Sequence, residues 1–235
     1  MLRTFKGIIF DMDGLMFDTE PIYRKSMQQA AVELGYDIDD QLQNRLFGRS
    51  ISDWRTTLIQ IFGENYPQFS KRRRQIWEQH VQEVGVTQKS GLVDLLNQLD
   101  EDNLPKGIAT SSSRPDALLC LGELTGRFEV IVTGDEVKQG KPAPDIFLLA
   151  TQRLALSPEH CLVLEDSESG AQAALTAGMS VILVPDLNPP PNELVAQVQR
   201  VCSSLHEVRK LFRSRNVPTA PQQGDALHYT QPTED

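Results

Sequence analysis

The stretch Gly7-Ile8-Ile9-Phe10-Asp11-Met12-Asp13-Gly14 joins a short apolar run to two closely spaced carboxylates and a glycine. A continuous apolar run, rather than an alternating one, is typical of a strand that is buried on both faces of a parallel sheet. Ligands of such sheets bind outside the carboxyl ends of the strands. The stretch therefore predicts a buried strand that delivers Asp11 and Asp13 to a binding edge.

Four further apolar runs have the same character. They occupy residues 106–110, 130–133, 161–164 and 181–184. Helical patterns separate the later ones, at residues 115–121, 145–154 and 171–177. Alternating strands and helices form βαβ units, whose strands pair in parallel. The sequence therefore predicts an α/β fold with a doubly wound parallel sheet, Rossmann-like in its core.

The region from about residue 23 to residue 85 differs, because it contains helical patterns and no convincing strand. An all-helical insertion after the first strand indicates a small cap domain placed over the sheet. We therefore expect core segments at residues 1–17 and 89–212, a helical cap at residues 18–88, and hinges near residues 16–18 and 85–91. From residue 213 to residue 235, proline, glutamine, glycine and acidic residues predominate without an apolar period. This composition predicts a disordered tail.

Polar side chains follow four of the predicted strands at the points where these strands end. Besides Asp11 and Asp13, they are Thr110 and Ser111 after the second strand, Lys141 after the third, and Glu165 and Asp166 after the fourth. Each group alone could equally form a turn or cap a helix. Because parallel strands bring their carboxyl ends to one edge, the groups together indicate a single site.

The residue types suit the transfer of a phosphoryl group. The carboxylate of Asp11 can attack phosphorus and form an aspartyl-phosphate. Repulsion between this anion and a phosphomonoester dianion can be offset by Mg²⁺, bound between Asp11 and Asp166, and by the ammonium group of Lys141. Thr110 and the backbone N–H that follows it, that of Ser111, can bind a further phosphoryl oxygen.

Asp13 can supply the proton transfers that such a reaction needs. It lies two residues after Asp11, so we expect its side chain to point in a different direction. It can protonate the leaving alcohol and then activate a water molecule. This dual role requires surroundings that raise the proton affinity of its carboxyl group.

The ordered set of motifs resembles the haloacid dehalogenase (HAD) superfamily, in its phosphatase and β-phosphoglucomutase-like branch with a helical cap after the first strand. The match extends from Phe5 to about Phe212. It contains, in order, residues 11–14 (DMDG), Thr110, Lys141, and the pair Glu165 and Asp166.

The resemblance implies a role for each motif residue. Asp11 would be the nucleophile and Asp13 the general acid and base. Thr110 and Lys141 would bind phosphate, and Asp11, Asp166 and the backbone carbonyl of Asp13 would bind Mg²⁺. Glu165 would either bind the metal as well or support its ligands. Because the dehalogenases of the family lack the second aspartate, Asp13 favours phosphoryl chemistry over dehalogenation.

The cap is expected to decide which phosphorylated compound is accepted. Glu20 belongs to the segment that opens the first cap helix, and Arg49 lies between two cap helices, where this family often places substrate contacts. We expect both side chains to contact the substrate. The basic run at residues 71–74 (KRRR) resembles a nucleic-acid patch, but its helical surroundings and the acidic net charge favour a solvated helix face.

The overall composition restricts the partners of the chain. Its 235 residues include 23 basic and 32 acidic side chains, which gives a formal net charge of −9. This charge disfavours binding to nucleic acid or to anionic lipid. No apolar run approaches the about 20 residues that cross a bilayer, and the first residues lack the apolar core of a signal peptide. We therefore expect a monomeric cytoplasmic protein without nucleic-acid or membrane partners, in which the three cysteines are buried free thiols.

The function predicted from the sequence is Mg²⁺-dependent hydrolysis of a small phosphomonoester, such as a sugar phosphate, phosphoglycolate or a nucleotide. β-Phosphoglucomutase is an alternative, because it resembles the chain in every motif. In that relative, a histidine near the start of the first cap helix controls engagement of the acid/base aspartate. The corresponding residues here offer Tyr23, which favours hydrolysis. A receiver domain, a non-enzymatic phospho-acceptor, uses similar residues around Mg²⁺ but is much shorter and has no helical insertion.

Overall fold

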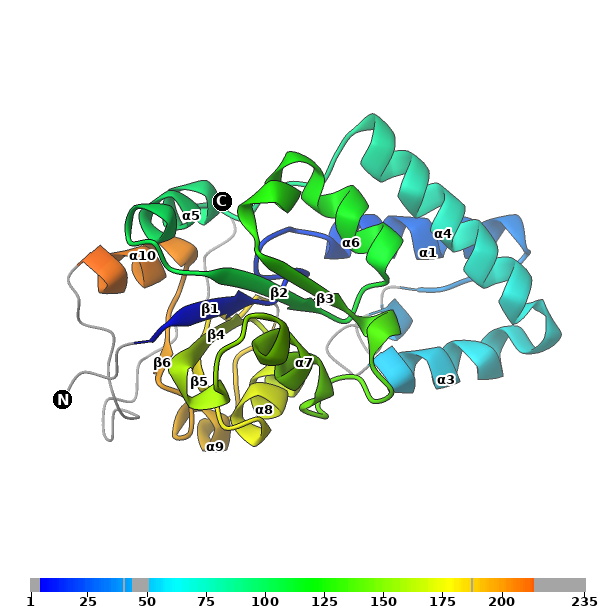
Figure 1. The fold of residues 1–235 in the computed structure, drawn as a ribbon. Coiled ribbons are helices and arrows are strands. Elements are labelled where there is room, and N and C mark those ends of the chain that lie inside the picture. Colours follow the sequence, from blue (N-terminus) through cyan, green and yellow to red (C-terminus); the bar gives the residue numbers. More distant parts are fainter. Residues whose placement is uncertain (1–4, 40, 44–50, 187, 214–235) are drawn as a thin grey trace.

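One six-stranded parallel sheet organises the protein in the computed structural model, with the strand order β3-β2-β1-β4-β5-β6 (Figure 1). The structure describes residues 5–39, 41–43, 51–186 and 188–213, and for residues 51–54 the backbone alone. The strands are β1 (Gly7–Phe10), β2 (Lys106–Thr110), β3 (Val130–Thr133), β4 (Cys161–Glu165), β5 (Ser180–Leu183) and β6 (Arg200–Val201). The predicted α/β class with a parallel sheet is confirmed. Only β6 was not predicted, because its two residues are too few to form an apolar pattern.

Strand β1 lies at the centre of the sheet, because it pairs with β2 on one side and with β4 on the other. Ile8 is aligned with Lys106 of β2 and with Leu162 of β4. All four residues of β1 are buried, as the continuous apolar run predicts. The turn that follows β1 therefore lies in the middle of the carboxyl edge, with a neighbouring strand ending on either side.

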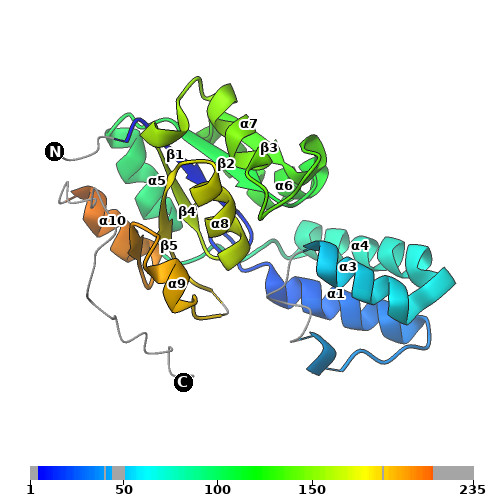
Figure 2. The same cartoon turned by 90° about the horizontal axis from the view of Figure 1, so that it is seen from below.

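Helices cover both faces of the sheet (Figures 1 and 2). On one face, Ile8 and Phe10 belong to an apolar cluster with α5 (Leu92–Glu101), α6 (Arg114–Leu121) and α10 (Leu205–Arg213). On the other face, Ile9 belongs to a cluster with α7 (Asp145–Arg153), α8 (Glu168–Thr176) and the short α9 (Asn192–Val195). Each large apolar side chain buried in these layers contributes about 1.5–3 kcal/mol. This double covering is the doubly wound arrangement expected from the sequence.

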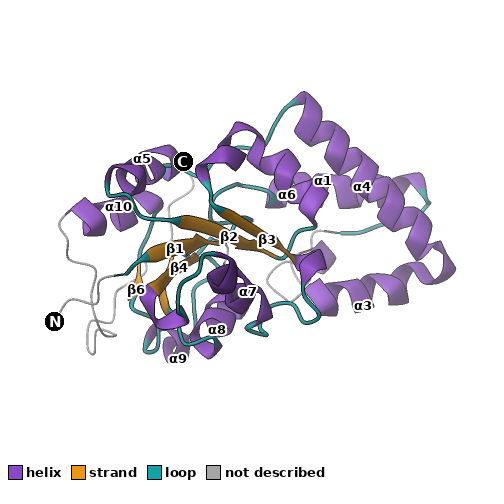
Figure 3. Cartoon of the chain, viewed as in Figure 1, coloured by secondary structure: helices purple, strands orange, loops and turns teal. Residues whose placement is uncertain are grey.

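The described residues between β1 and α5 form helices and no named strand (Figure 3). The helices are α1 (Glu20–Glu33), α3 (Ile51–Phe62) and α4 (Tyr66–Glu83), with the single 3-10 turn η1 (Gly63–Asn65) between α3 and α4. Their facing side chains make a separate apolar cluster, in which the rings of Phe62 and Phe69 stack with centroids 3.8 Å apart. The helical insertion therefore has a core of its own, and it lies beside the sheet as a separate layer (Figure 2).

Two linkers connect the insertion to the sheet, and they lie side by side. The backbone N–H of Asp18 donates a hydrogen bond to the carbonyl of Thr87 at 2.9 Å, and the N–H of Lys89 donates to the carbonyl of Met16 at 2.8 Å. Both hydrogen bonds cross from the segment after β1 to the segment before α5. The residues predicted as hinges are thus paired with each other through the backbone.

Three further predictions concern the cysteines, the tail and the membrane. Cys120, Cys161 and Cys202 are buried free thiols, as predicted. Helix α10 extends to Arg213, where the tail was expected to begin, and residues 214–235 lie outside the described part of the chain. Within that described part, no helix combines the length and the apolar character needed to cross a membrane.

Candidate active site

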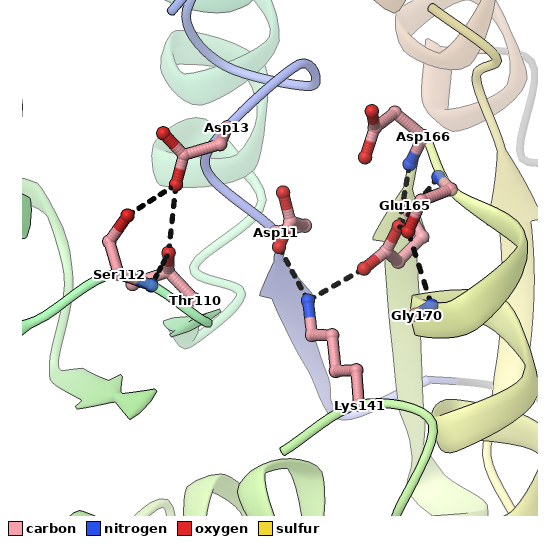
Figure 4. Close-up of polar contacts among 9 residues, drawn as sticks. Asp11, Asp13, Thr110, Ser112, Lys141, Glu165, Asp166 and Gly170 are labelled. Carbon is pink, nitrogen blue, oxygen red and sulfur yellow. Dashed lines mark hydrogen bonds and ion pairs between the residues drawn. The ribbon is translucent and has the colours of Figure 1, made fainter. Parts of the chain in front are cut away.

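The turn after β1 meets the ends of β2 and β4 at the carboxyl edge of the sheet. Asp11 and Asp13 follow β1, Thr110 is the last residue of β2, and Glu165 is the last residue of β4. Lys141 reaches the same place from the loop before α7 (Figure 4). The structure therefore brings together residues that the sequence places on four separate segments.

Lys141 bridges two buried carboxylates. Its Nζ atom lies 2.5 Å from Oδ1 of Asp11 and 2.6 Å from Oε1 of Glu165. The ring of Phe147 lies on another side of the ammonium group, with its centroid 5.0 Å from Nζ. Although burial disfavours the charged amine, the two carboxylates hold the pKa of Lys141 above its usual value. The side chain therefore remains charged and fixes the orientation of Asp11.

Asp11, Glu165 and Asp166 could hold a metal ion together. One carboxylate oxygen from each lies within 4.8 Å of the others. Burial raises the pKa of Asp11 to about 8, Lys141 opposes this shift, and the neighbouring carboxylates add to it. Burial and the charge of Glu165 likewise raise the pKa of Asp166. A divalent cation would stabilise such crowded carboxylates, and oxygen atoms are the ligands that Mg²⁺ prefers, so the donor set fits the predicted metal.

Glu165 has protein partners for both of its carboxylate oxygens. Oε1 accepts from Lys141, and Oε2 accepts from the backbone N–H groups of Asp166 and Ser167, each at 2.8 Å. The hydroxyl of Ser167 donates to Oε2 as well, at 2.9 Å. A Cβ atom on Gly170 would lie 1.6 Å from Oε1, so only glycine leaves room for this carboxylate. These contacts favour the second of the two roles expected for Glu165, that of supporting the metal ligands.

Asp13 is held through only one of its carboxylate oxygens. Its Oδ2 atom accepts hydrogen bonds from the hydroxyl of Thr110 at 3.1 Å and from that of Ser112 at 2.8 Å. Its Oδ1 atom is buried and has no hydrogen-bond partner among the described residues. A buried polar atom without a partner is costly, so this atom points to a partner that a ligand supplies. Oδ1 is therefore the carboxylate atom of Asp13 that is left for a ligand to contact.

Ser112 is a site residue that the sequence analysis missed. Its hydroxyl donates to Asp13, and its backbone N–H donates to Oγ1 of Thr110 at 3.0 Å. Thr110, predicted to bind phosphate, thus also positions Asp13, and the half-buried Ser111 follows it at the end of β2. The run of hydroxyl residues after β2 contained the signal for Ser112, because alternate residues of an extended chain point to the same side.

Gly14 allows a carboxylate to pack against the turn after β1. Its φ angle is +89°, a conformation that other residues rarely adopt. A Cβ atom at this position would lie 2.2 Å from Oδ2 of Asp166. Glycine is therefore required both by the backbone conformation and by the close approach of Asp166.

The insertion reaches Asp13 through Tyr23 on α1. The ring of Tyr23 stacks on Trp77 of α4 with centroids 5.6 Å apart, and the guanidinium carbon of Arg73 lies 5.6 Å from the Tyr23 centroid. Burial raises the pKa of Tyr23, the charge of Asp13 adds to this shift, and a hydrogen bond with Ser112 opposes it. Tyr23 therefore lies next to Asp13 and Ser112.

The basic run on α4, expected to form a solvated helix face, is solvated only in part. Arg72 pairs with Glu33 on the surface of the insertion. Arg74 lies 3.0 Å from Asp116 of α6, so its ion pair joins the insertion to the core. Burial lowers the pKa of Arg73, which is half-buried. The expectation of a solvated face therefore holds for the exposed Arg74, which also pairs with the core, and it fails in part for the half-buried Arg73.

The structure describes one of the two substrate contacts predicted on the insertion. Glu20 lies in the first turn of α1 and forms an ion pair with Arg24. The Oε2 atom of Glu20 is buried and, within the part of the chain that the structure describes, has no hydrogen-bond partner. Arg49 lies outside the described residues. Like Oδ1 of Asp13, Oε2 of Glu20 is thus a hydrogen-bond acceptor without a partner in the described residues, and a hydroxyl group of a ligand could donate to it.

Comparison with known proteins relates the chain to one family of hydrolases. A family model described as haloacid dehalogenase-like hydrolase matches residues 8–184. A phosphorylated carbohydrates phosphatase of Thermotoga maritima is 33% identical over 181 residues, which cover 75% of this chain and 83% of that protein. The fructose-1-phosphate phosphatase of Escherichia coli is 31% identical over 183 residues, which cover 77% of this chain and 97% of that protein. The crystal structure of CbbY from Rhodobacter sphaeroides in complex with phosphate aligns with a TM-score of 0.76 at 25% identity, over 87% of this chain and 96% of that chain.

These matches confirm two predictions made from the sequence. The family model spans most of the chain, and it names the superfamily that the motifs resemble. The two relatives are phosphatases by name, and each is more than 30% identical over most of its length. The chain therefore belongs to the haloacid dehalogenase-like hydrolases and is a phosphatase of that family.

Proposed function

We propose that this chain hydrolyses small phosphorylated sugars, with Mg²⁺ as cofactor and phosphorylated Asp11 as the intermediate. The observation that carries the proposal is the cluster of Asp11, Lys141 and Asp166, with the unpartnered Oδ1 atom of Asp13 on the same turn as Asp11. A nucleophile, a fixed cation, an acidic metal site and a proton donor are the parts that this reaction requires. The relatives named for phosphorylated carbohydrates and for fructose 1-phosphate support the sugar class.

In the first half-reaction, an oxygen of Asp11 attacks phosphorus while the bond between phosphorus and the leaving oxygen breaks. Asp13 gives a proton from Oδ1 to that oxygen, so the sugar leaves as a neutral alcohol. Lys141, with Nζ 2.5 Å from Asp11, balances the negative charge on the phosphoryl oxygens. The backbone N–H of Ser111 binds those oxygens from the end of β2, and Thr110 joins it when its hydroxyl, which donates to Asp13 in the free protein, turns toward the phosphoryl group. At the end of this step, Asp11 is phosphorylated and Asp13 is ionised.

In the second half-reaction, Asp13 takes a proton from a water molecule while the water oxygen attacks phosphorus. The bond between phosphorus and Asp11 breaks, which restores the carboxylate and releases inorganic phosphate. Mg²⁺, held by Asp11, Asp166 and the backbone carbonyl of Asp13, would supply positive charge that reduces repulsion between carboxylate and phosphate.

We further propose that residues 18–88 act as a cap that closes over this site, with the core at residues 1–17 and 89–212. The ion pair between Arg74 of α4 and Asp116 of α6, at 3.0 Å, supports closure of the insertion onto the core. The proposed contacts with the sugar are Arg49 and Glu20, the latter through its unpartnered Oε2 atom. Closure excludes water and thereby strengthens the electrostatic interactions inside the site.

A panel of phosphomonoesters, assayed for released phosphate, tests the proposed function. With Mg²⁺ we expect faster release from hexose phosphates than from phosphoglycolate or nucleoside monophosphates, and no release when the metal is chelated. β-Glucose 1-phosphate tests the mutase alternative, and Tyr23 leads us to expect its hydrolysis. If it were converted to glucose 6-phosphate faster than phosphate appears, the mutase would be the better assignment. If no compound released phosphate, the proposed function would be wrong.

Replacing Gly14 with alanine should weaken both Mg²⁺ binding and turnover by about tenfold or more, because the new methyl group displaces Asp166. Its Cβ would lie 2.2 Å from a carboxylate oxygen of Asp166. Calorimetric Mg²⁺ titration and phosphate release measure the two effects. Gly35→Ala is the matched control, because Gly35 has φ +78° and no atom within 4 Å of the added Cβ. Equal losses in both variants would attribute the effect to backbone strain instead.

Mg²⁺ binding should release protons near neutral pH. Burial raises the pKa of Asp11 and of Asp166, so protons compete with the metal for these carboxylates, whereas a bound cation favours their ionised forms. The apparent affinity should therefore rise with pH through neutrality, by up to about tenfold per pH unit for each carboxyl that must lose a proton. Calorimetry in buffers of different ionisation enthalpy counts the released protons. An affinity that is equal on both sides of neutrality would contradict this prediction.

A further inference from the structure

A second lysine at the carboxyl edge has no part in the proposed chemistry. Lys89 lies in the linker before α5, and its Nζ atom lies 2.5 Å from Oδ1 of Asp186 and 3.5 Å from Oδ1 of Asp18. Asp18 belongs to the linker after β1, and Asp186 belongs to the loop after β5. One ammonium group thus joins three segments that are far apart in the sequence.

The ion pair of Lys89 with Asp186 is the more shielded of the two. The exposed fraction of the side chain is 18% for Asp186, 26% for Lys89 and 41% for Asp18. Against the effect of burial, hydrogen bonds and charges from Asp186 and Asp18 hold the pKa of Lys89 above its usual value. Solvent and salt weaken a partly buried pair less than an exposed one. The pair with Asp186 is therefore the stronger of the two.

Asp186 also lies close to the proposed metal site. From the position that a Cβ atom on Gly14 would occupy, Oδ2 of Asp166 lies at 2.2 Å and Oδ2 of Asp186 lies at 3.4 Å. The two carboxylates therefore approach the same point of the backbone. Without a cation beside it, Asp186 would add an uncompensated negative charge next to Asp166, and like charges this close repel each other. Lys89 supplies the compensating charge.

The backbone of Lys89 belongs to the same junction. Its N–H donates to the carbonyl of Met16 at 2.8 Å, next to the hydrogen bond from Asp18 to Thr87 at 2.9 Å. Its carbonyl accepts from the N–H of Leu92 at 3.2 Å, where α5 begins. Lys89 is thus attached to a core helix on one side and to the first linker on the other.

We propose that Lys89 is a positioning residue that braces both linkers against the loop after β5 and keeps Asp186 neutralised beside Asp166. The proposal rests on the proposed function only in that the insertion moves as a cap. Opening must bend the paired linkers. The ion pair of Lys89 with Asp18 holds the two linkers together, and its ion pair with Asp186 holds them against the loop after β5. Without the ammonium group, Asp18 and Asp186 repel each other, so the linkers separate more often and the closed arrangement is less populated.

Amide hydrogen exchange in the free protein tests the brace without any substrate. In Lys89→Met, the amides of Asp18 and of residue 89 should exchange about tenfold faster, because separation of the linkers exposes both. Ile9, in the central strand, should keep its exchange rate. Arg72→Met is the matched control, because it removes an ion pair with Glu33 that lies within the insertion. It should leave both linker amides unchanged.

Further variants separate a charge brace from a loss of packing. Lys89→Arg keeps the charge, so the amides of Asp18 and of residue 89 should exchange at rates within about threefold of those in the unchanged protein. Asp186→Asn should accelerate the same amides, and the double variant with Lys89→Met should be no faster than either single variant, because each removes the same pair. Additive effects, or unchanged exchange in Lys89→Met, would overturn the brace. If Lys89→Met does not fold, exchange in Asp186→Asn and Lys89→Arg decides the question.

A kinetic measurement distinguishes positioning from a purely structural role. In Lys89→Met, the KM for a hydrolysed sugar phosphate should rise severalfold while kcat changes by less than about twofold, because the reacting groups are untouched. A purely structural residue would lower the melting temperature and leave KM unchanged, and that result would overturn the proposal. If the unchanged protein hydrolyses nothing, the proposed function fails, whereas the exchange rates still decide for or against the brace.

Discussion

Replacing Asp11 with asparagine should lower phosphatase turnover by several orders of magnitude while the protein remains folded. The amide keeps the shape of the side chain but carries no charge, so it cannot attack phosphorus. It also removes one of the two carboxylates that Lys141 contacts, the one at 2.5 Å. The phosphoryl group then has no acceptor other than water, which attacks slowly. Phosphate release from the best compound of the panel, at saturating Mg²⁺, measures the loss.

A matched variant and an inhibitor make this test specific. Asp102→Asn removes an exposed carboxylate at the end of α5 and should keep full activity. Beryllium fluoride with Mg²⁺ should inhibit the unchanged protein, because it resembles a phosphoryl group bonded to a carboxylate. Near-normal turnover in a folded Asp11→Asn protein would rule out the aspartyl-phosphate mechanism.

The second large effect is expected for Asp13→Asn, at about 10²–10⁴-fold in turnover. The amide oxygen can keep the hydrogen bonds from Thr110 and Ser112, so the side chain should hold its position. What the variant loses is the proton that Oδ1 gives to the leaving sugar and later takes from water. The decrease in turnover of a sugar phosphate therefore measures proton transfer.

A leaving group that needs no proton separates this role from metal binding. p-Nitrophenolate leaves phosphorus without protonation. In single-turnover experiments, Asp13→Asn should therefore reduce the rate at which p-nitrophenyl phosphate phosphorylates the protein much less than the rate at which a sugar phosphate does. Ser112→Ala, which removes a hydrogen bond to Asp13 but no proton, should cause a smaller loss with both esters. Equal losses with the two esters would count against Asp13 as the acid.

Most of the sheet could be predicted from the sequence because its strands are buried on both faces. The runs at residues 7–10 and 161–164 are continuous apolar stretches that are followed by carboxylates. Each can be identified as a strand from its own sequence, without knowledge of the strands that pair with it. The same reasoning located Asp11, Lys141 and Asp166. Parallel strands share one carboxyl edge, so knowing where β1 and β4 end is sufficient to bring Asp11 and Asp166 together, whereas Lys141 reaches this edge from the loop before α7.

The polar contacts of the insertion and its linkers could not be predicted in this way. Arg74 and Lys89 form ion pairs with residues of other segments, and no local pattern indicates such partners. The period of a helix shows which of its faces is apolar, but it does not show which core residue a given charge will meet. For that reason the KRRR run was interpreted only as a solvated face, whereas its exposed Arg74 also pairs with Asp116 of the core.

The central position of β1 affects how the chain acquires its structure during synthesis. Strand β1 is synthesised before both of its neighbours. Strand β2 follows only after the whole insertion, and β4 follows only after β2 and β3. Helices α1, α3 and α4 draw their apolar cluster from one continuous region, so they can fold while β1 still lacks a partner. The strand that leads directly into Asp11 is thus the earliest to leave the ribosome, yet it is enclosed on both sides only when β4 arrives.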